Sequence, residues 1–135
     1  MFAGGKVWFT AEADKAIGSY DPVAKKIDWV LGTGQNRTHM IFVSDDLKRI
    51  VTSNVSSATM TIIEKSSGGG RGFGAGPGPS RGGLPQGDWD ETVVAVGRGA
   101  EGFDVSPNGK EIWTANAQRL LLTAGVPSRL PSKPE

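Results

Sequence analysis

A short strand-like segment occurs three times in this chain of 135 residues, and the repetition restricts the folds open to it. The copies are KVWFTAE from Lys6, KRIVTSN from Lys48 and KEIWTAN from Lys110. The first two begin 42 residues apart and the last two 62 residues apart, because a Gly-rich stretch lies between them. Since repeated units bury their core against neighbouring units, the sequence predicts a repeat protein and not a globular enzyme built around one site.

The segments around these copies predict short strands separated by turns. The expected strands cover 7–11, 16–20, 27–31 and 40–43 as one blade, followed by 50–53, 59–63, 92–96, 103–105 and 112–115. No window has a sustained helical period, so the class is all-β. A period near 42 is typical of a four-stranded propeller blade. At this period the chain holds little more than two blades, whereas closed propellers need about four to eight blades. We therefore predict a partial β-propeller of four-stranded antiparallel blades.

Two turns repeat together with the strands. VSDDLK, from Val43, aligns with VSPNGK, from Val105, and the Asn-Gly pair of the second copy is a strong hairpin signal. Leu47 stands in the first copy where the second has Gly109. We expect Leu47 either to adopt an unfavourable backbone conformation or to change the turn type, at a cost of about 1 kcal/mol.

These motifs resemble the repeats of the YVTN family, whose signature is Val-Ser-Pro-Asp/Asn-Gly-Lys, any residue, an apolar residue, Tyr-Val-Thr-Asn. The chain has VSDDLKRIVTSN at 43–54, VSPNGKEIWTAN at 105–116, and FTAE at 9–12 as the end of a third copy. Glu12 departs from the Asn of the family. The resemblance covers roughly 5–65 and 89–117. It implies a lactonase-like or quinoprotein amine dehydrogenase-like propeller, usually seven-bladed and often exported by bacteria.

The chain divides by composition into four segments. Residues 1–65 contain the first YVTN-type blades, and 89–117 a further partial blade. Between them, 66–88 is rich in Gly and Pro, cannot bury enough apolar surface to fold and is expected to be disordered. The tail at 118–135 abandons the repeat. Either it is a natural terminus or the reading frame was lost near residue 118; we favour truncation of a longer propeller.

Composition excludes several classes of function. With no cysteine, the chain has no disulfide, thiolate metal site or cysteine nucleophile. Its formal net charge of +1 gives no field that would attract nucleic acid or anionic lipid. Only Arg71 and Arg81 in the Gly-rich stretch suggest RNA binding, and we expect no nucleic-acid partner. No apolar run is long enough for a membrane span, and the N-terminal residues do not have the pattern of a signal peptide. The sequence therefore leaves the location unknown. The resemblance to the YVTN family implies a periplasmic or extracellular protein.

His39 and Glu101 are the candidate ligand-binding residues. His39 is the only histidine, and both residues occupy the same place before a repeat strand, near one mouth of a propeller channel. A metal or acid–base role and a repeat-specific hydrogen-bonding role both remain open. We predict no catalytic residue, cofactor or metal. We expect Trp8 and Trp113 to pack between blades and Trp29 and Trp89 to be more exposed. A role of the tryptophans in binding a sugar or a cofactor is the less favoured alternative.

Two functional hypotheses follow. The first is a non-catalytic binding or scaffold module for a protein or a small ligand. The second is a fragment of a lactonase-like hydrolase or of a quinoprotein dehydrogenase-type enzyme whose catalytic residues lie mostly in other blades. Because unpaired strand edges and uncovered blade faces attract other chains, self-association is also expected.

Overall fold

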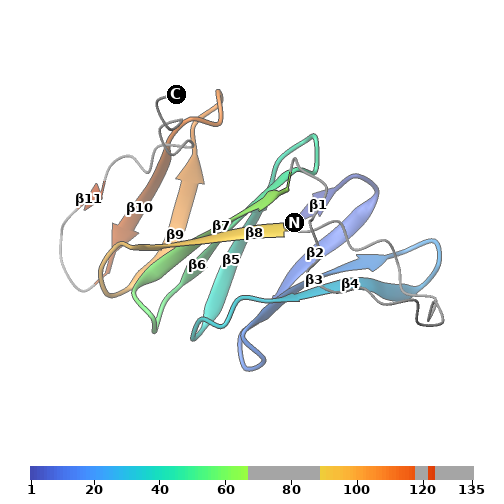
Figure 1. Cartoon of the computed structure of the whole chain (residues 1–135), viewed down its shortest axis with the longest axis horizontal. Coiled ribbons are helices and arrows are strands. Elements are labelled where there is room, and N and C mark those ends of the chain that lie inside the picture. The colour runs from blue at the N-terminus through green and yellow to red at the C-terminus, as the bar shows by residue number, and fades with distance from the viewer. Residues whose placement is uncertain (67–88, 118–121, 124–135) are drawn as a thin grey trace, which may run out of the picture.

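The computed structural model describes residues 1–66, 89–117 and 122–123. These residues form three antiparallel sheets that lie side by side (Figure 1). The first sheet contains β1 (Phe2–Ala3), β2 (Lys6–Ala11), β3 (Ala16–Asp21) and β4 (Lys26–Gly32). The second contains β5 (Thr38–Val43), β6 (Arg49–Asn54), β7 (Thr59–Lys65) and β8 (Trp89–Ala95), and the third β9 (Ala100–Val105), β10 (Ile112–Asn116) and β11 (Leu122–Thr123).

The all-β class and every expected strand are confirmed, but the grouping of strands into the first blade was wrong. The strand expected at 40–43 is part of β5, which pairs with β6 and begins the second sheet. The first sheet is completed instead by β1, which pairs with β2. Thr38–Val43 joins the second sheet because the turn after it is a hairpin into β6, whereas 33–37 connects one sheet to the next.

The second sheet continues across the Gly-rich stretch. β8 pairs with β7 along seven residues, from Thr59 opposite Ala95 to Lys65 opposite Trp89. The segment 66–88 therefore separates two neighbouring strands of one sheet. Apart from Ser66, it lies outside the described residues, as does the tail at 118–135 apart from 122–123. Among the described residues there is no helix that could cross a membrane.

The turns before β6 and β10 have the same geometry. Their hairpins close with backbone bonds from Ser44 N to Arg49 O and from Ser106 N to Glu111 O, both at 2.9 Å. Leu47 has a φ of 57° where Gly109 has 68°, so the predicted strained conformation of Leu47 is confirmed. The side chain of Leu47 packs against the core between the first two sheets, which offsets the strain.

The structure corrects the alignment of the first repeat by one residue. Lys15 and Ala58 stand immediately before β3 and β7 and both have positive φ, 53° and 57°. Their carbonyls accept equivalent backbone bonds from the segment leaving each sheet, at 2.7 and 3.0 Å. The two residues are 43 positions apart, so Ala11, and not Glu12, is the equivalent of Asn54.

This shift has its origin in the first hairpin. Ala3 pairs with Lys6 across the two-residue turn Gly4-Gly5, so the longer turn that fixes the other two repeats is absent there. Side chains alternate between the two faces of a strand, and a shift of one residue exchanges them. Trp8 consequently faces the second sheet.

Apolar side chains fill the two spaces between sheets. Between the first and second sheets lie Trp8, Ile17, Val43, Ile50 and Ile63. Between the second and third lie Val51, Met60, Ile62, Val96, Ala100 and Ile112. Each sheet is thus buried against its neighbours, as a stack of propeller blades requires.

The tryptophan predictions were correct only for Trp8, which is 6% exposed. Trp29 and Trp89, expected to be more exposed, pack against the first core, and their ring centroids are 5.5 Å apart. Trp8 and Trp29 lie 5.6 Å apart. Trp113 is 42% exposed, because it points away from the second sheet while its neighbours in β10 point toward it.

A buried chain of polar side chains also joins the first two sheets. Asn54 is fully buried; its Oδ1 accepts from Thr38 Oγ1 at 2.9 Å, and its Nδ2 donates to Thr61 Oγ1 at 2.9 Å and Thr59 Oγ1 at 3.2 Å. Thr33 Oγ1 lies 2.8 Å from Thr38 Oγ1. Thr33 Oγ1 also donates to the backbone carbonyl of Lys15, next to β3, at 2.9 Å. These contacts therefore connect the linker with both the first and the second sheet.

Candidate functional site

His39 and Glu101 occupy equivalent places in β5 and β9. Each lies in a β-bulge. His39 follows Thr38, which pairs with Asn54 at the end of β6. Glu101 follows Ala100, which pairs with Asn116 at the end of β10. The backbone carbonyl of His39 accepts a bond from Thr10 Oγ1 at 2.8 Å, and that of Glu101 from Ser53 Oγ at 2.9 Å. In both cases a hydroxyl of one sheet binds the first strand of the next. The expected hydrogen-bonding role is thus observed for their main chains.

Their side chains belong to a group of four charged or titratable residues, which we call the Arg37 cluster: Glu12, Arg37, His39 and Glu101. His39 Nδ1 is hydrogen-bonded to Glu12 Oε1. Arg37 lies between the two carboxylates, with Nε 3.7 Å from Glu12 Oε2 and Nη2 3.5 Å from Glu101 Oε1. The cluster joins His39 to Glu101 through Arg37 and so connects all three sheets.

The cluster is accessible from solvent. The side chains of its members are between 41% and 53% exposed. Both ion-pair distances of Arg37 are longer than an ordinary hydrogen bond, so neither carboxylate uses the guanidinium donors in the close bidentate geometry that makes such pairs strong. Ion pairs at this exposure contribute little to stability, about 0–1 kcal/mol each. A ligand can therefore replace them at small cost.

The backbone of Arg37 is strained. Its φ is 55°, and the equivalent residue before β9 is Gly99, with a φ of 81°. The two positions share a backbone bond, from Val55 N to Arg37 O at 3.0 Å and from Ala117 N to Gly99 O at 2.9 Å. A left-handed conformation costs a side-chain-bearing residue roughly 1–2 kcal/mol. Lys15, Leu47 and Ala58 have the same left-handed conformation in turns, so what distinguishes Arg37 from its repeat equivalent is the side chain that it carries there.

Sequence reasoning missed Arg37 and Glu12. The signal for Arg37 was a side chain at a place where the other repeat has glycine. Glu12 was noted only as a departure from the repeat Asn, but the structure places it in the turn after β2, from which it reaches β5 of the next sheet.

The cluster offers a mixture of charges without a metal-binding geometry. Within 1–66, 89–117 and 122–123, no group of three His, Cys, Asp or Glu side chains is arranged to hold a metal ion. The cluster presents two carboxylates, a guanidinium and an imidazole, which can bind a polar ligand that has both donors and acceptors. The bond from His39 to Glu12 also fixes one ring nitrogen of the imidazole and leaves Nε2 to accept or donate a proton.

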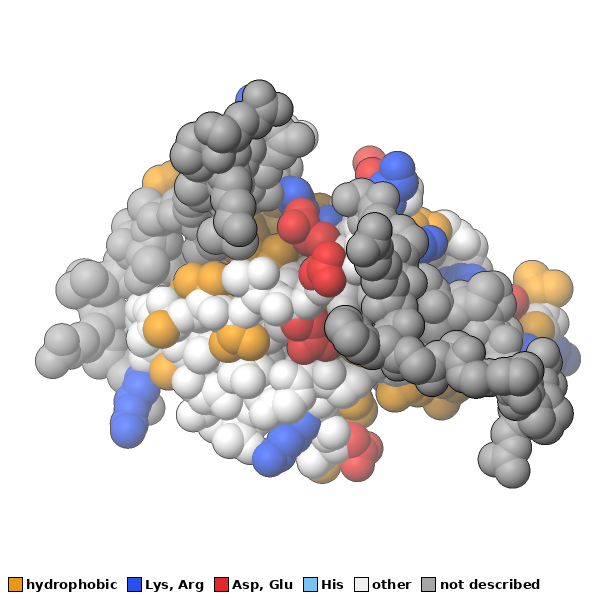
Figure 2. All heavy atoms as spheres, viewed as in Figure 1, with side chains coloured by type: hydrophobic (Ala, Val, Ile, Leu, Met, Phe, Trp, Pro, Cys, Tyr) orange, Lys and Arg blue, Asp and Glu red, His pale blue; other side chains and the backbone are white. Residues whose placement is uncertain are grey.

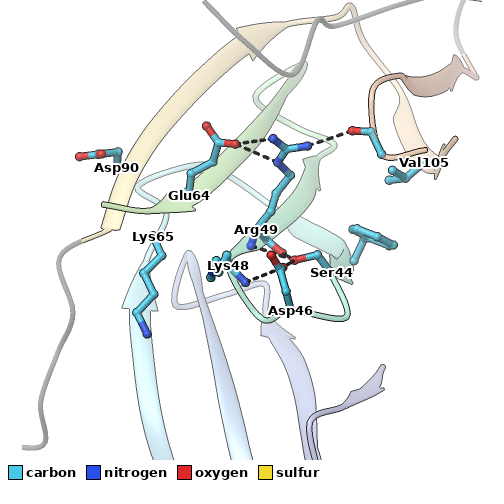
Figure 3. Close-up of a pocket in the computed structure, with 10 residues that line it drawn as sticks. Ser44, Asp46, Lys48, Arg49, Glu64, Lys65, Asp90 and Val105 are labelled. Carbon is cyan, nitrogen blue, oxygen red and sulfur yellow. Dashed lines mark hydrogen bonds and ion pairs between the residues drawn. The ribbon is translucent and has the colours of Figure 1, made fainter. Parts of the chain in front are cut away.

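A pocket of about 470 Å³ lies at the opposite end of the second and third sheets. In it Arg49 donates to Glu64 Oε1 from Nε at 2.9 Å and from Nη2 at 2.6 Å, and to Gly109 O at 2.9 Å. Figure 3 shows Arg49 and Glu64 pointing toward one another, with Lys65 and Asp90 directed away from them. The pocket is lined by charges of both signs, and its arginine is already bound by protein groups.

Hydrogen bonds also organise the turn at the rim of this pocket. Ser44 Oγ donates to Asp46 Oδ1 at 2.7 Å, and the backbone N–H of Lys48 donates to the same oxygen at 3.1 Å. The Ser44 hydroxyl, followed by the Lys48 N–H, lowers the pKa of Asp46. Ser44 is thus part of the repeated turn, as its recurrence at Ser106 indicates.

The fold is similar to two solved structures. Hydrazine synthase of Kuenenia stuttgartiensis matches with a TM-score of 0.61 and 12% identity over 93% of this chain and 33% of that one. A putative 6-phosphogluconolactonase from Bacteroides uniformis matches with a TM-score of 0.57 and 15% identity over 90% of this chain and 36% of that one. The chain thus spans about a third of the length of each. No family model and no curated protein matches the sequence.

At this level of identity the likeness is one of fold. Both structures are of the propeller type, and the present chain matches part of each. Together with its four-stranded antiparallel sheets, this shows an all-β partial β-propeller.

Proposed function

We propose that this chain is a non-catalytic binding segment of a YVTN-type propeller, with the Arg37 cluster as the polar part of its ligand site. The observation that carries the proposal is the position of Arg37 between two exposed carboxylates, in a backbone conformation that costs it energy. The repeated turns and strands support membership of the YVTN type, although the sequence matches no family model.

The ligand in this proposal is a small polar molecule or a protein surface with a carboxylate and hydrogen-bonding groups. Its carboxylate takes the donors of Arg37, and its remaining polar groups bind His39 and Glu101. The site is open enough for either kind of partner, since all its side chains are partly exposed.

Isothermal titration with gluconate, citrate and arginine as probes tests the site. We expect at least one of the two anionic probes, gluconate and citrate, to bind, and Arg37→Gly to weaken that binding at least tenfold. Arg37→Gly is informative because it restores the residue found at the equivalent place and removes backbone strain, so the fold is retained. Arg98→Gly is the matched control, since Arg98 does not belong to the cluster. Equal binding by wild type and Arg37→Gly, or no binding of any probe, would refute the proposal.

A second candidate function is lactonase-like hydrolysis, favoured by the bond between His39 and Glu12. A carboxylate that orients an imidazole can make it a general base toward water. We rank this function second because no metal-binding group accompanies the pair among the described residues. Hydrolysis of glucono-δ-lactone above the spontaneous rate, lost in His39→Ala, would support this function over simple binding.

A further inference from the structure

The charges of the Arg37 cluster do not balance. Two carboxylates, those of Glu12 and Glu101, face the single guanidinium of Arg37. With a neutral imidazole on His39, the four side chains therefore have a net charge of −1. Among the described residues, no other ion pair brings a further cation to the cluster. A ligand in this site meets an excess of negative charge.

The rest of the molecule does not cancel this local charge. The chain as a whole has a formal net charge of only +1. On the face in Figure 2, basic side chains lie at several separate places among acidic, apolar and uncharged ones. Exposed charges farther apart than about 10 Å are largely screened in roughly 0.1 M salt. The groups of the cluster itself therefore decide which charges a ligand must carry.

A ligand with a carboxylate as its single charged group suits the cluster poorly. Its carboxylate would take donors of Arg37 and would then lie beside Glu12 and Glu101, which are 3.7 and 3.5 Å from the same guanidinium. Three carboxylates would share one cation, and like charges at such separations repel one another. A positive group on the ligand, close to its carboxylate, removes this repulsion.

We infer, on the basis of the proposed function, that the ligand of the Arg37 cluster is a zwitterion with an ammonium group next to its carboxylate, as in an α-amino acid. In such a ligand the nitrogen lies about 3 Å from the carboxylate oxygens, because one carbon separates the two groups. Glu101 Oε1 is 3.5 Å from Arg37 Nη2. An ammonium beside a carboxylate that binds Arg37 therefore comes within reach of Glu101.

The two carboxylates of the cluster are not equivalent partners for this ammonium. Glu12 is hydrogen-bonded to His39 Nδ1 as well as being close to Arg37. Among the described residues, the one ion-pair partner of Glu101 is Arg37, and the Glu101 side chain is 53% exposed. The ligand ammonium consequently binds Glu101, while its carboxylate binds Arg37.

Three matched probes test this ligand class in isothermal titration of the 135-residue chain at pH 7.5. They are gluconate, 2-amino-2-deoxygluconate and the N-acetyl derivative of the latter. All three have the same carboxylate and polyhydroxyl chain, but only the second has an ammonium group. We expect 2-amino-2-deoxygluconate to bind at least about threefold more tightly than gluconate, a factor in the range of one exposed ion pair. The N-acetyl derivative should bind no more tightly than gluconate.

Glu101→Gln identifies the group that selects the ammonium. Because it removes one negative charge at nearly constant size, it should weaken binding of 2-amino-2-deoxygluconate and leave gluconate binding equal or tighter. The ratio of the two dissociation constants then falls to about one. Glu111→Gln is the matched control and should leave this ratio unchanged. Glu111 is exposed and precedes Ile112, which pairs with Val105 at the other end of β9 from Glu101.

The outcomes separate the ligand class from the site itself. Equal binding of gluconate and 2-amino-2-deoxygluconate by the wild type would overturn the zwitterion inference and leave the proposed binding site standing. A preference for the amino probe that persists in Glu101→Gln would overturn it as well. Absence of binding by all three probes would refute the proposed function together with the ligand class. Circular dichroism checks that each variant retains the fold.

Discussion

The buried bonds of Asn54 give the sharpest prediction about stability. Asn54→Ala removes three hydrogen bonds of ordinary length, at 2.9, 2.9 and 3.2 Å, from a side chain that is fully buried. A buried hydrogen bond contributes about 1 kcal/mol net, so the free energy of unfolding should fall by about 3 kcal/mol. The hydroxyls of Thr38 and Thr61 that lose their partner are also fully buried, and an unsatisfied buried group adds to the loss.

Urea unfolding followed by tryptophan fluorescence measures this loss. Asn36→Ala is the matched control, because Asn36 is exposed and its truncation should change the unfolding free energy by less than about 0.5 kcal/mol. In a double-mutant cycle, Asn54→Ala and Thr61→Val should show a coupling of about 0.5–1.5 kcal/mol, since they share one bond. A loss for Asn54→Ala equal to that of the control, or a coupling of zero, would refute the reasoning.

Two further predictions concern the first sheet. Gly4→Ala should lower the unfolding free energy by about 1–2 kcal/mol more than Gly5→Ala. Both glycines have positive φ, but an added Cβ at Gly4 would lie 2.5 Å from Leu47 Cδ1, whereas an added Cβ at Gly5 would have nothing within 4 Å. Equal losses of the two variants in urea unfolding would contradict this. The pKa of Asp28 is lowered mainly by its hydrogen bond from Lys6, so its stabilising contribution is present above the unfolded pKa of about 3.8 and is lost as pH falls through the lower folded value. Unfolding free energies measured from pH 6 to pH 2 should therefore fall less steeply in Asp28→Asn than in the wild type. Parallel curves for the two proteins would contradict this.

The sequence alone determined the fold class and the local geometry of the strong repeats. Alternating β-branched and aromatic residues between turn signals predicted strands that the structure confirms, because both signals act over a few residues. The match of Leu47 with Gly109 left two possibilities, an unfavourable backbone conformation or another type of turn, and the structure shows the first, with a φ of 57°.

The tertiary structure decided which strands share a sheet and which residues form the site. The first hairpin lacks the repeated turn, and its two-residue turn at Gly4-Gly5 gives a register that places Trp8 in the core between the first two sheets and moves Glu12 out of the place of Asn54. Arg37 and Glu12 join the cluster because linker and turn residues from different sheets meet at one end of the stack. Contacts between sheets are made by residues far apart in sequence, so a repeat can predict equivalent positions but not which of them meet.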